Sequence, residues 1–223
     1  AVMSQPKRGL DLRAALDDDE ASEERAKPLE ERKEQLRVLL SANEKDIDKL
    51  VRRNPNVLAR RDIEEHHGQK LALLQERLGI DQKAAGRLCL NANRLLTFSF
   101  ETLETKIDWL QAKLNINKSQ LRKIVDRAPH VLTYSIEDKL EPTIDSIQSS
   151  LELSDKELTK MIVKQPDVLN FNLSAEHIKQ RFSFLQEALD LPEGDVASLR
   201  KYTMRRPDIL VWREDSMKGS TWL

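Results

Sequence analysis

The sequence holds little of what a disulfide-linked, metal-cluster or membrane-spanning protein requires. Its 223 residues include one cysteine, Cys89, so no disulfide and no cysteine-based metal cluster can form within the chain. Glycine occurs six times and aromatic residues make up only 4%, a composition that favours helices over strands. No run approaches the roughly 18 consecutive apolar residues of a membrane-spanning helix. The composition therefore predicts an all-α protein without such a helix.

An excess of charge of one sign is also missing, because 37 Lys and Arg stand against 38 Asp and Glu. This average hides an asymmetry. Residues 1–31 hold 5 basic and 9 acidic residues, a net charge of −4, whereas residues 32–223 hold 32 basic and 29 acidic residues, a net charge of +3. The near-neutral total argues against a dedicated duplex DNA binder. The acidic start predicts an N-terminal arm over residues 1–35, for which a basic surface is the expected partner.

Motifs of catalysis and cofactor binding are absent from the sequence. There is no phosphate-binding loop and no glycine-rich dinucleotide turn. His66 and His67 are adjacent and would point in different directions on a helix, while His130 and His177 occupy unrelated places in the chain. Ordinary surface or partly packed histidines are therefore expected, and Cys89 is expected to pack as a small apolar residue. We predict a protein that is not an enzyme, with no catalytic residue, no metal site and no cofactor.

The clearest feature that is present is an internal repeat. Four phrases share the order x-Pro-x-[Val/Ile]-Leu, and a fifth is similar but has Ala92 at the proline position. The proline positions 55, 92, 129, 166 and 207 are separated by 37, 37, 37 and 41 residues. Such a period indicates stacked helical units, since one helix pair cannot bury its apolar face alone. The phrases are Asn54–Leu58, Asn91–Leu95, Ala128–Leu132, Gln165–Leu169 and Arg206–Leu210.

The residues before each phrase predict a first helix in every unit. Apolar residues lie eight, five and four positions before the proline, as Leu121, Ile124 and Val125 do, and these positions share one helical face. Proline then ends the helix, because its ring removes a donor and restricts the preceding residue. Two Ser-x-x-Glu sequences, starting at Ser41 and Ser154, are predicted to be capping boxes that open the first helix.

A second amphipathic run follows each phrase. Gly79 and Asn115, which come directly after two of these runs, are predicted left-handed helix caps. The sequence thus predicts an array of four full units and a half unit over residues 36–213, and a tail over residues 214–223. The predicted second helices are Ile63–Leu78, Phe100–Leu114, Ile136–Leu151 and Leu173–Leu189. The leucines expected to be buried in the turns are Leu58, Leu95, Leu132, Leu169 and Leu210.

The third unit carries the fullest match to a known family. It reads Leu121-x-x-Ile124-Val125-x-x-x-Pro129-x-Val131-Leu132-Thr133-Tyr134-Ser135-Ile136-Glu137-x-x-Leu140-x-Pro142. This pattern resembles the repeats of the mitochondrial transcription termination factor (mTERF) family, and the similarity covers most of residues 36–213. The resemblance implies a curved α-solenoid with two long helices and a short 3₁₀ turn per unit, and a concave basic groove. It also implies a protein of the mitochondrial matrix or the plastid stroma that binds organellar DNA or RNA.

Basic residues recur in register with the turns and form a candidate nucleic-acid site. They lie six and two positions before the proline in four units, so each pair is spaced i,i+4 on one helical face. The second unit interrupts the series with Gly86 and Leu90. Such a stripe suits phosphate contacts, and it equally suits a solvated helix end where cations offset the helix dipole. The candidate residues are Lys49, Arg53, Lys123, Arg127, Lys160, Lys164, Lys201 and Arg205.

Two functions stay open on these grounds. The first is nucleic-acid binding, of RNA rather than duplex DNA, by an organellar protein acting in gene expression. The alternative is a structural or protein-interaction subunit of a large organellar assembly, such as a ribosome, a polymerase or a membrane energy complex. The half unit at the C-terminal end favours this alternative, and Trp212, Trp222 and Leu223 are the predicted partner-binding residues there. The start at Ala1 fits removal of a targeting peptide, or a chain shortened by design.

Overall fold

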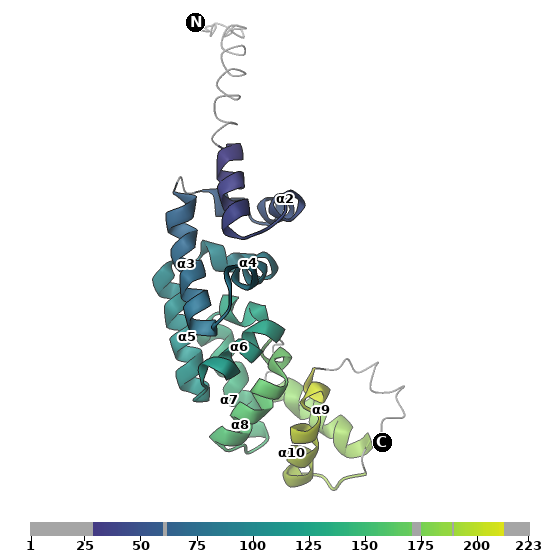
Figure 1. Cartoon of the computed structure of the whole chain (residues 1–223). Helices are drawn as coiled ribbons and strands as arrows, with labels where there is room; N and C mark the ends of the chain where they lie inside the picture. Colours follow the sequence, from purple (N-terminus) through teal and green to yellow (C-terminus); the bar gives the residue numbers. More distant parts are fainter. Residues whose placement is uncertain (1–28, 60–61, 171–174, 189, 212–223) are drawn as a thin grey trace, which may run out of the picture.

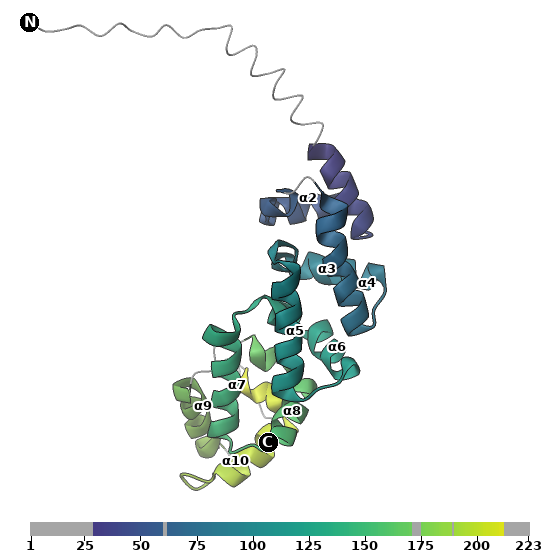
Figure 2. The ribbon, with the colours of Figure 1, turned by 90° about the vertical axis from the view of Figure 1, so that its left-hand side faces the viewer.

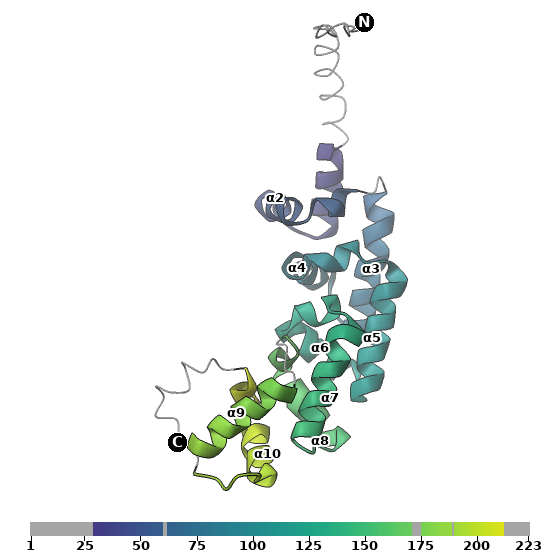
Figure 3. The same ribbon diagram turned by 180° about the vertical axis from the view of Figure 1, so that it is seen from behind.

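The computed structural model describes residues 29–59, 62–170, 175–188 and 190–211, and these ranges contain helices and turns but no strand. The helices follow one another in a curved stack (Figure 1), which confirms the predicted α-solenoid. Figure 3 shows α2, α4 and α6 along the inner side of the curve and α3 and α5 along its outer side. Figure 2 shows α3, α5 and α7 as a staggered, near-parallel row. Within the described ranges no helix is long and apolar enough to cross a membrane.

Each unit consists of a first helix, a short turn and a second helix. The first helices are α2 (Glu44–Arg53), α4 (Gln82–Asn91), α6 (Lys118–Arg127), α8 (Asp155–Lys164) and α10 (Val196–Arg205). The second helices are α3 (Ile63–Leu78), α5 (Phe100–Leu114), α7 (Glu141–Ser150) and α9 (Ala175–Ala188). The turns are η1 (Pro55–Leu58), η2 (Asn93–Thr97), η3 (Pro129–Thr133), η5 (Pro166–Leu169) and η6 (Pro207–Leu210), and the π-helical turn η4 (Ile136–Leu140) opens α7.

The first helices begin at polar caps. Asn117 accepts a hydrogen bond from the backbone N–H three residues later, as an N-cap should. The capping box predicted for Ser154 is confirmed, with Glu157 as its second member. The capping box predicted for Ser41 is wrong, because Asn43 caps α2 instead. Ser41 has a φ of 49° and ends the helix before it, so its side chain lies too early to cap α2.

The first helices end where proline predicts. The helices α2, α6, α8 and α10 each stop two residues before Pro55, Pro129, Pro166 and Pro207, and a 3₁₀ turn starts at the proline. The five turn leucines are at most 4% exposed, which confirms their predicted burial. They belong to a continuous apolar core that runs from the N-terminal helix to η6.

The second unit departs from the predicted register by one residue. The C-caps of all five first helices share one conformation, with φ between −148° and −115° and ψ between 64° and 80°, and this residue is Ala92 in α4 and Ala128 in α6. Because Pro129 follows Ala128, the residue at the proline position of the second unit is Asn93. The turn positions 55, 93, 129, 166 and 207 are 38, 36, 37 and 41 residues apart, so the predicted equal intervals are wrong.

Pro142 explains the π-helical start of α7. The backbone N–H of Leu140 donates to the carbonyl oxygen of Ser135 at 3.0 Å, five residues back, and that of Glu141 donates to Ile136 in the same way. Proline has no N–H to donate, and its ring would collide with the carbonyl four residues before it. The wider π turn accommodates the ring. The predicted second helix of this unit otherwise runs from Ile136 to Ser150 as expected.

A residue in the left-handed conformation follows the second helix of each unit. Gly79 and Asn115 have φ values of 64° and 47°, which confirms their predicted role. Ser41, Glu152 and Asp190 adopt the same conformation with φ values of 49° to 51°. The five positions are 38, 36, 37 and 38 residues apart, and this spacing supports the corrected register independently of the turns.

Residues 29–39 form a helix that matches the second helices of later units. When it is aligned on Ser41 and Gly79, its Leu36 and Leu40 correspond to Leu74 and Leu78 of α3, and all four leucines are buried. The N-terminal helix is therefore a second helix that covers the apolar face of the first full unit. The division into arm, array and tail stays a prediction, and its first boundary, between residues 35 and 36, falls within this helix.

Candidate nucleic-acid interface

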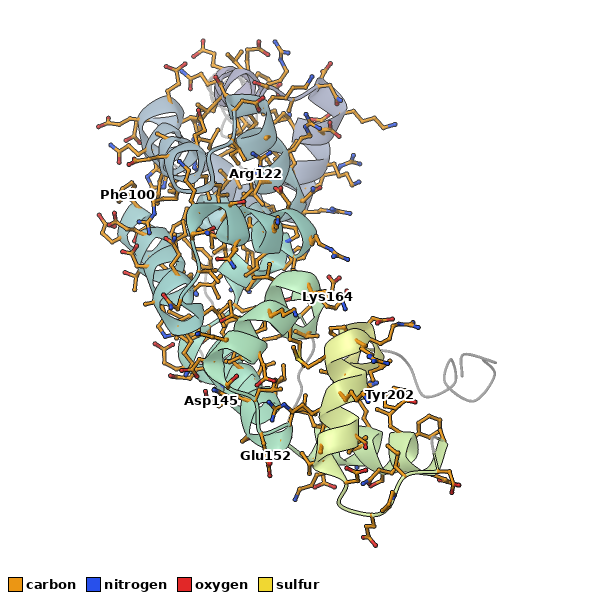
Figure 4. The ribbon with its side chains drawn as sticks, turned by 60° about the horizontal axis from the view of Figure 1, so that its bottom comes forward. Phe100, Arg122, Asp145, Glu152, Lys164 and Tyr202 are labelled. Atoms are coloured by element: carbon orange, nitrogen blue, oxygen red, sulfur yellow. The ribbon has the colours of Figure 1, made fainter. Side chains whose placement is uncertain are left out.

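The eight basic residues predicted as a nucleic-acid site all lie exposed on the first helices. Four of them lie near the middle of their helix and four at its end. Figure 4 shows one of the latter, Lys164, at the surface of α8. Their helices, α2, α6, α8 and α10, follow one another along the stack with α4 between the first two, so the eight residues form a band that α4 interrupts.

The corrected register brings a ninth cation into this band. With Asn93 at the turn position, Arg87 lies six residues before it and Asn91 two residues before it, and both are exposed. All five first helices therefore carry an exposed cation at the earlier position, and the interruption predicted for the second unit remains only at the later position, where Asn91 is uncharged. We define the mid-helix row as Lys49, Arg87, Lys123, Lys160 and Lys201. We define the helix-end row as Arg53, Asn91, Arg127, Lys164 and Arg205.

The two rows line hollows between consecutive first helices. The larger hollow, of about 600 Å³, lies between α6 and α8. Its rim holds one acidic residue, Asp155, whose carboxylate accepts a hydrogen bond from Gln148 at 2.8 Å. A smaller hollow of about 140 Å³ lies between α2 and α4 and includes Lys49 and Arg53. The basic residues of the larger hollow are Lys123, Lys156, Lys160 and Lys164, of which Lys156 was missed by the sequence analysis because it falls outside both repeat positions.

The first and second helices carry opposite net charges. The five first helices hold 16 Lys and Arg against 6 Asp and Glu, a net charge of +10. The four second helices, with η4, hold 7 against 12, a net charge of −5. The near-zero charge of the whole chain therefore conceals a basic side and an acidic side. A polyanion is attracted to the first helices and repelled by the second helices.

The ion pairs of the described residues leave both rows out. Consecutive second helices are joined by the pairs Arg77–Asp108 and Lys113–Asp145. Across the part of the chain that the structure describes, no side chain of the mid-helix row or the helix-end row forms an ion pair. The charge of these rows is therefore not offset by a paired carboxylate, and it is available to an external anion.

Two members of the helix-end row nevertheless have backbone partners. Arg127 Nη1 donates to the carbonyl oxygen of Lys164 at 2.9 Å, and Lys164 Nζ donates to that of Arg205 at 2.6 Å. Each acceptor lies in the last turn of the next first helix, where carbonyl groups lack partners within the helix. A cation at that place also offsets the negative end of the helix dipole. At these two positions the structural role that the sequence left open is therefore present.

A further set of basic side chains, missed by the sequence analysis, connects each second helix to the following turn. The first member, Arg32, donates to the carbonyl oxygen of Leu58 at 2.8 Å, and the second, Lys70, is 1% exposed. The acceptors are backbone carbonyls at the ends of the turns, which leave no trace in the sequence. These cations are therefore structural. The pairs are Arg32–Leu58, Lys70–Leu96, Lys106–Tyr134, Lys139–Asn170 and Arg181–Ile209.

Two other chemically reactive side chains, His67 and Cys89, are packed into the fold. His67 is 2% exposed and its Nε2 donates to the carbonyl oxygen of Val57 at 2.8 Å, so the expected surface or partly packed position is wrong for this histidine. Burial lowers the pKa of His67 to about 4. Cys89 is buried as predicted, and burial raises the pKa of its thiol to about 12, which keeps it unreactive. In the described ranges no group of three or more His, Cys, Asp or Glu residues could hold a metal ion.

The predicted partner-binding residues Trp212, Trp222 and Leu223 lie outside the described residues. The adjoining described surface is α10, on which Tyr202 is 40% exposed (Figure 4). Tyr202 lies five residues before its turn. The residues at the same place in the other first helices are Leu50, Leu88, Ile124 and Met161, which are 0–8% exposed.

Known proteins are similar to this chain in sequence. A model of the mTERF family matches residues 69–202, which is more than half of the chain and extends from α3 to α10. The chain is also 33% identical over 103 residues to a mouse (Mus musculus) protein, transcription termination factor 3, mitochondrial. That alignment covers 46% of this chain and 23% of the mouse protein, so the chain aligns with about a quarter of that relative. The protein belongs to the mTERF family.

Proposed function

We propose that this protein binds nucleic acid through its first helices and acts, without catalysis, in mitochondrial gene expression. The observation that carries the proposal is the mid-helix row. It presents one exposed cation in each of five consecutive first helices, such as Arg87 and Lys123, and none of these side chains forms an ion pair within the described ranges. Phosphate binding by such cations releases counterions from the nucleic acid, which supplies a large part of its binding free energy.

RNA is the proposed ligand in preference to duplex DNA. A duplex carries a phosphate charge about every 1.7 Å of its axis, and proteins that hold it usually carry a large excess of positive charge. This chain has a net charge of −1, and its basic residues are concentrated on one side of the stack. A basic groove that follows one backbone is typical of proteins that hold single strands.

The proposed location rests on the family and on the mouse relative, whose name places it in mitochondria. That name also describes a transcription termination factor, which supports a role in organellar gene expression. The step at which this chain acts, in transcription, RNA processing or ribosome assembly, follows from the ligand that it selects. The ligand preference is therefore the quantity to measure first.

The test is a comparison of binding to single-stranded RNA, single-stranded DNA and duplex DNA of equal length. The double variant Lys123→Glu/Lys160→Glu reverses two charges in the larger hollow. We expect it to weaken RNA binding by roughly tenfold or more at about 50 mM salt, because two phosphate contacts become repulsions. Fluorescence anisotropy measures the affinities, and circular dichroism checks that the helical content is retained.

The matched control is Lys179→Glu, which reverses an exposed lysine on the second helix α9. We expect this variant to bind RNA within about twofold of the unchanged protein, since it lies on the acidic class of helices and ionic attraction weakens over about 10 Å. An equal loss in Lys179→Glu and in the double variant would contradict binding at the first helices. Tighter binding of duplex DNA than of RNA would contradict the proposed ligand.

A second candidate function is a protein-interaction subunit of an organellar assembly. It is favoured by Tyr202, which is 40% exposed where the corresponding residues of the other first helices are at most 8% exposed. An exposed aromatic side chain at the end of an array is suited to burial by a partner protein. The same measurements separate the two functions, because a protein that bound none of the three nucleic acids would leave this second function as the better one.

A further inference from the structure

The two rows of the basic side differ in their chemistry. The mid-helix row holds a cation in every unit, and no side chain of it donates a hydrogen bond within the described ranges. The helix-end row holds the uncharged Asn91 in the second unit. Two of its four cations, Arg127 and Lys164, already donate to backbone carbonyls of the next first helix. A ligand therefore meets one complete line of available cations and one interrupted line.

The complete line occupies one repeat position in five successive first helices. Packed helices lie about 8–10 Å apart, and α6 and α8, which carry Lys123 and Lys160, pack on each other. The hollow between α6 and α8 has Lys123 on one wall and Lys160 on the other. This arrangement fits one phosphate backbone that crosses the units in turn. Two backbones would need a second complete line.

Two hydrogen bonds of the helix-end row connect first helices that carry mid-helix cations. Arg127 connects the end of α6 to the end of α8, and Lys164 connects the end of α8 to the end of α10. These are the three helices that carry Lys123, Lys160 and Lys201. Beside the shared core, two side chains that the ligand does not need to touch thus connect the helices that carry the three mid-helix cations.

On the basis of the proposed nucleic-acid function, we propose that the two rows have different roles. The mid-helix row contacts a single strand, with one phosphate contact per unit. Arg127 and Lys164 are positioning residues, which fix the distance between consecutive contacts without binding phosphate themselves. The ligand class is therefore a single-stranded segment that spans all five units.

The test compares variants matched in charge change. Arg87→Gln and Arg127→Gln each neutralise an exposed arginine of a first helix, and Lys123→Gln and Lys164→Gln each neutralise an exposed lysine. The ligand is a labelled single-stranded RNA of about 30 uridines, which is longer than the mid-helix row. Anisotropy measures its affinity as the salt concentration is raised from about 50 to 200 mM. Thermal unfolding of each variant is followed in parallel.

Five contacts to a single strand predict a slope of log affinity against log salt of about −3.5, a loss of about a hundredfold over this salt range. Arg87→Gln and Lys123→Gln should flatten the slope by about 0.7 each, with an unchanged melting temperature. Arg127→Gln and Lys164→Gln should keep the slope of the unchanged protein and lower the melting temperature. Lys164→Arg, which keeps a donor at the helix end, should restore the melting temperature.

The proposal of different roles is overturned if Arg127→Gln and Lys164→Gln flatten the slope of log affinity against log salt as much as Arg87→Gln and Lys123→Gln do. It is also overturned if a duplex of the same length binds more tightly than the single strand, with a slope that requires both rows. These outcomes leave nucleic-acid binding itself intact. A complete lack of binding to any nucleic acid at about 50 mM salt would instead remove the proposed function, and this inference with it.

Discussion

At the scale of single residues, one close approach between units depends on the absence of a side chain. A Cβ atom added to Gly86 would lie 2.0 Å from the carbonyl oxygen of Leu40 and 2.7 Å from its carbonyl carbon. Both are backbone atoms and cannot rotate away. The same helix position, seven residues before the turn, is Arg122 in α6 and Arg200 in α10, whose side chains donate to carbonyl oxygens at the ends of earlier second helices. In α4 the backbone at Gly86 lies against the Leu40 carbonyl group, where the other two helices use an arginine side chain.

We therefore expect Gly86→Ala to destabilise the protein by about 1–3 kcal/mol, the usual cost of overpacking. Gly68→Ala is the matched control, because a Cβ atom at Gly68 in α3 meets nothing within 4 Å. Alanine is the better helix former, so this control should gain about 0.4–1 kcal/mol. Denaturation by urea, followed by circular dichroism, measures both changes. A Gly86→Ala protein as stable as the control would show that α4 does not approach Leu40 this closely.

At the scale of helices, the capping box of α8 also joins two units. Glu157 accepts hydrogen bonds from Ser154 in its own box, and from Arg200 of α10 at 2.5 Å. The Arg200 guanidinium, followed by the Ser154 hydroxyl and backbone N–H, lowers the pKa of Glu157 to about 2. A carboxyl group with a lowered pKa stabilises the folded state above its ordinary pKa of 4.5, and this contribution is lost as the pH falls from there towards 2.

The variant Glu157→Gln tests this contribution. Glutamine can still accept the backbone bond of a capping box, but it neither titrates nor pairs with Arg200. Between about pH 5 and pH 3, on either side of the ordinary carboxyl pKa of 4.5, the melting temperature should fall further in the unchanged protein than in Glu157→Gln. Other carboxyl groups titrate in both proteins and cancel in the difference. Parallel curves across this range would mean that the Arg200 contact does not persist in solution.

The sequence predicted the helices and turns well, because proline position and apolar spacing report directly on backbone geometry. It failed where the signal was degenerate. In the second unit no proline marks the turn and Leu95 is followed by Leu96, so the phrase fits at either leucine. The resulting shift by one residue hid Arg87 from the candidate site. The bonds of Arg127 and Lys164 could not be predicted at all, because their acceptors are carbonyl groups of the next helix.

At the scale of the whole molecule, the stack has opposite net charges on its two classes of helix. The first helices have a net charge of +10 and the second helices a net charge of −5, so the basic excess and the acidic excess lie on different classes of helix. The overall charge of −1 is therefore the sum of a basic excess and an acidic excess that lie on different helices. Each class repeats once per unit, so the field is extended along the stack. A linear polyanion matches this field better than a compact anion does.

The stack also needs a cover at each end, since a terminal unit otherwise leaves apolar surface in water. The helix over residues 29–39 is such a cover, because Leu36 and Leu40 are 0% and 1% exposed within the common core. Leu36→Ala should therefore cost about 2–5 kcal/mol, as for other buried leucines. Val38→Ala is the control on the same helix, where the side chain is 57% exposed, and it should change stability by less than about 0.5 kcal/mol. Equilibrium urea denaturation distinguishes the two, and a small, equal effect of both substitutions would mean that the array starts only at α2.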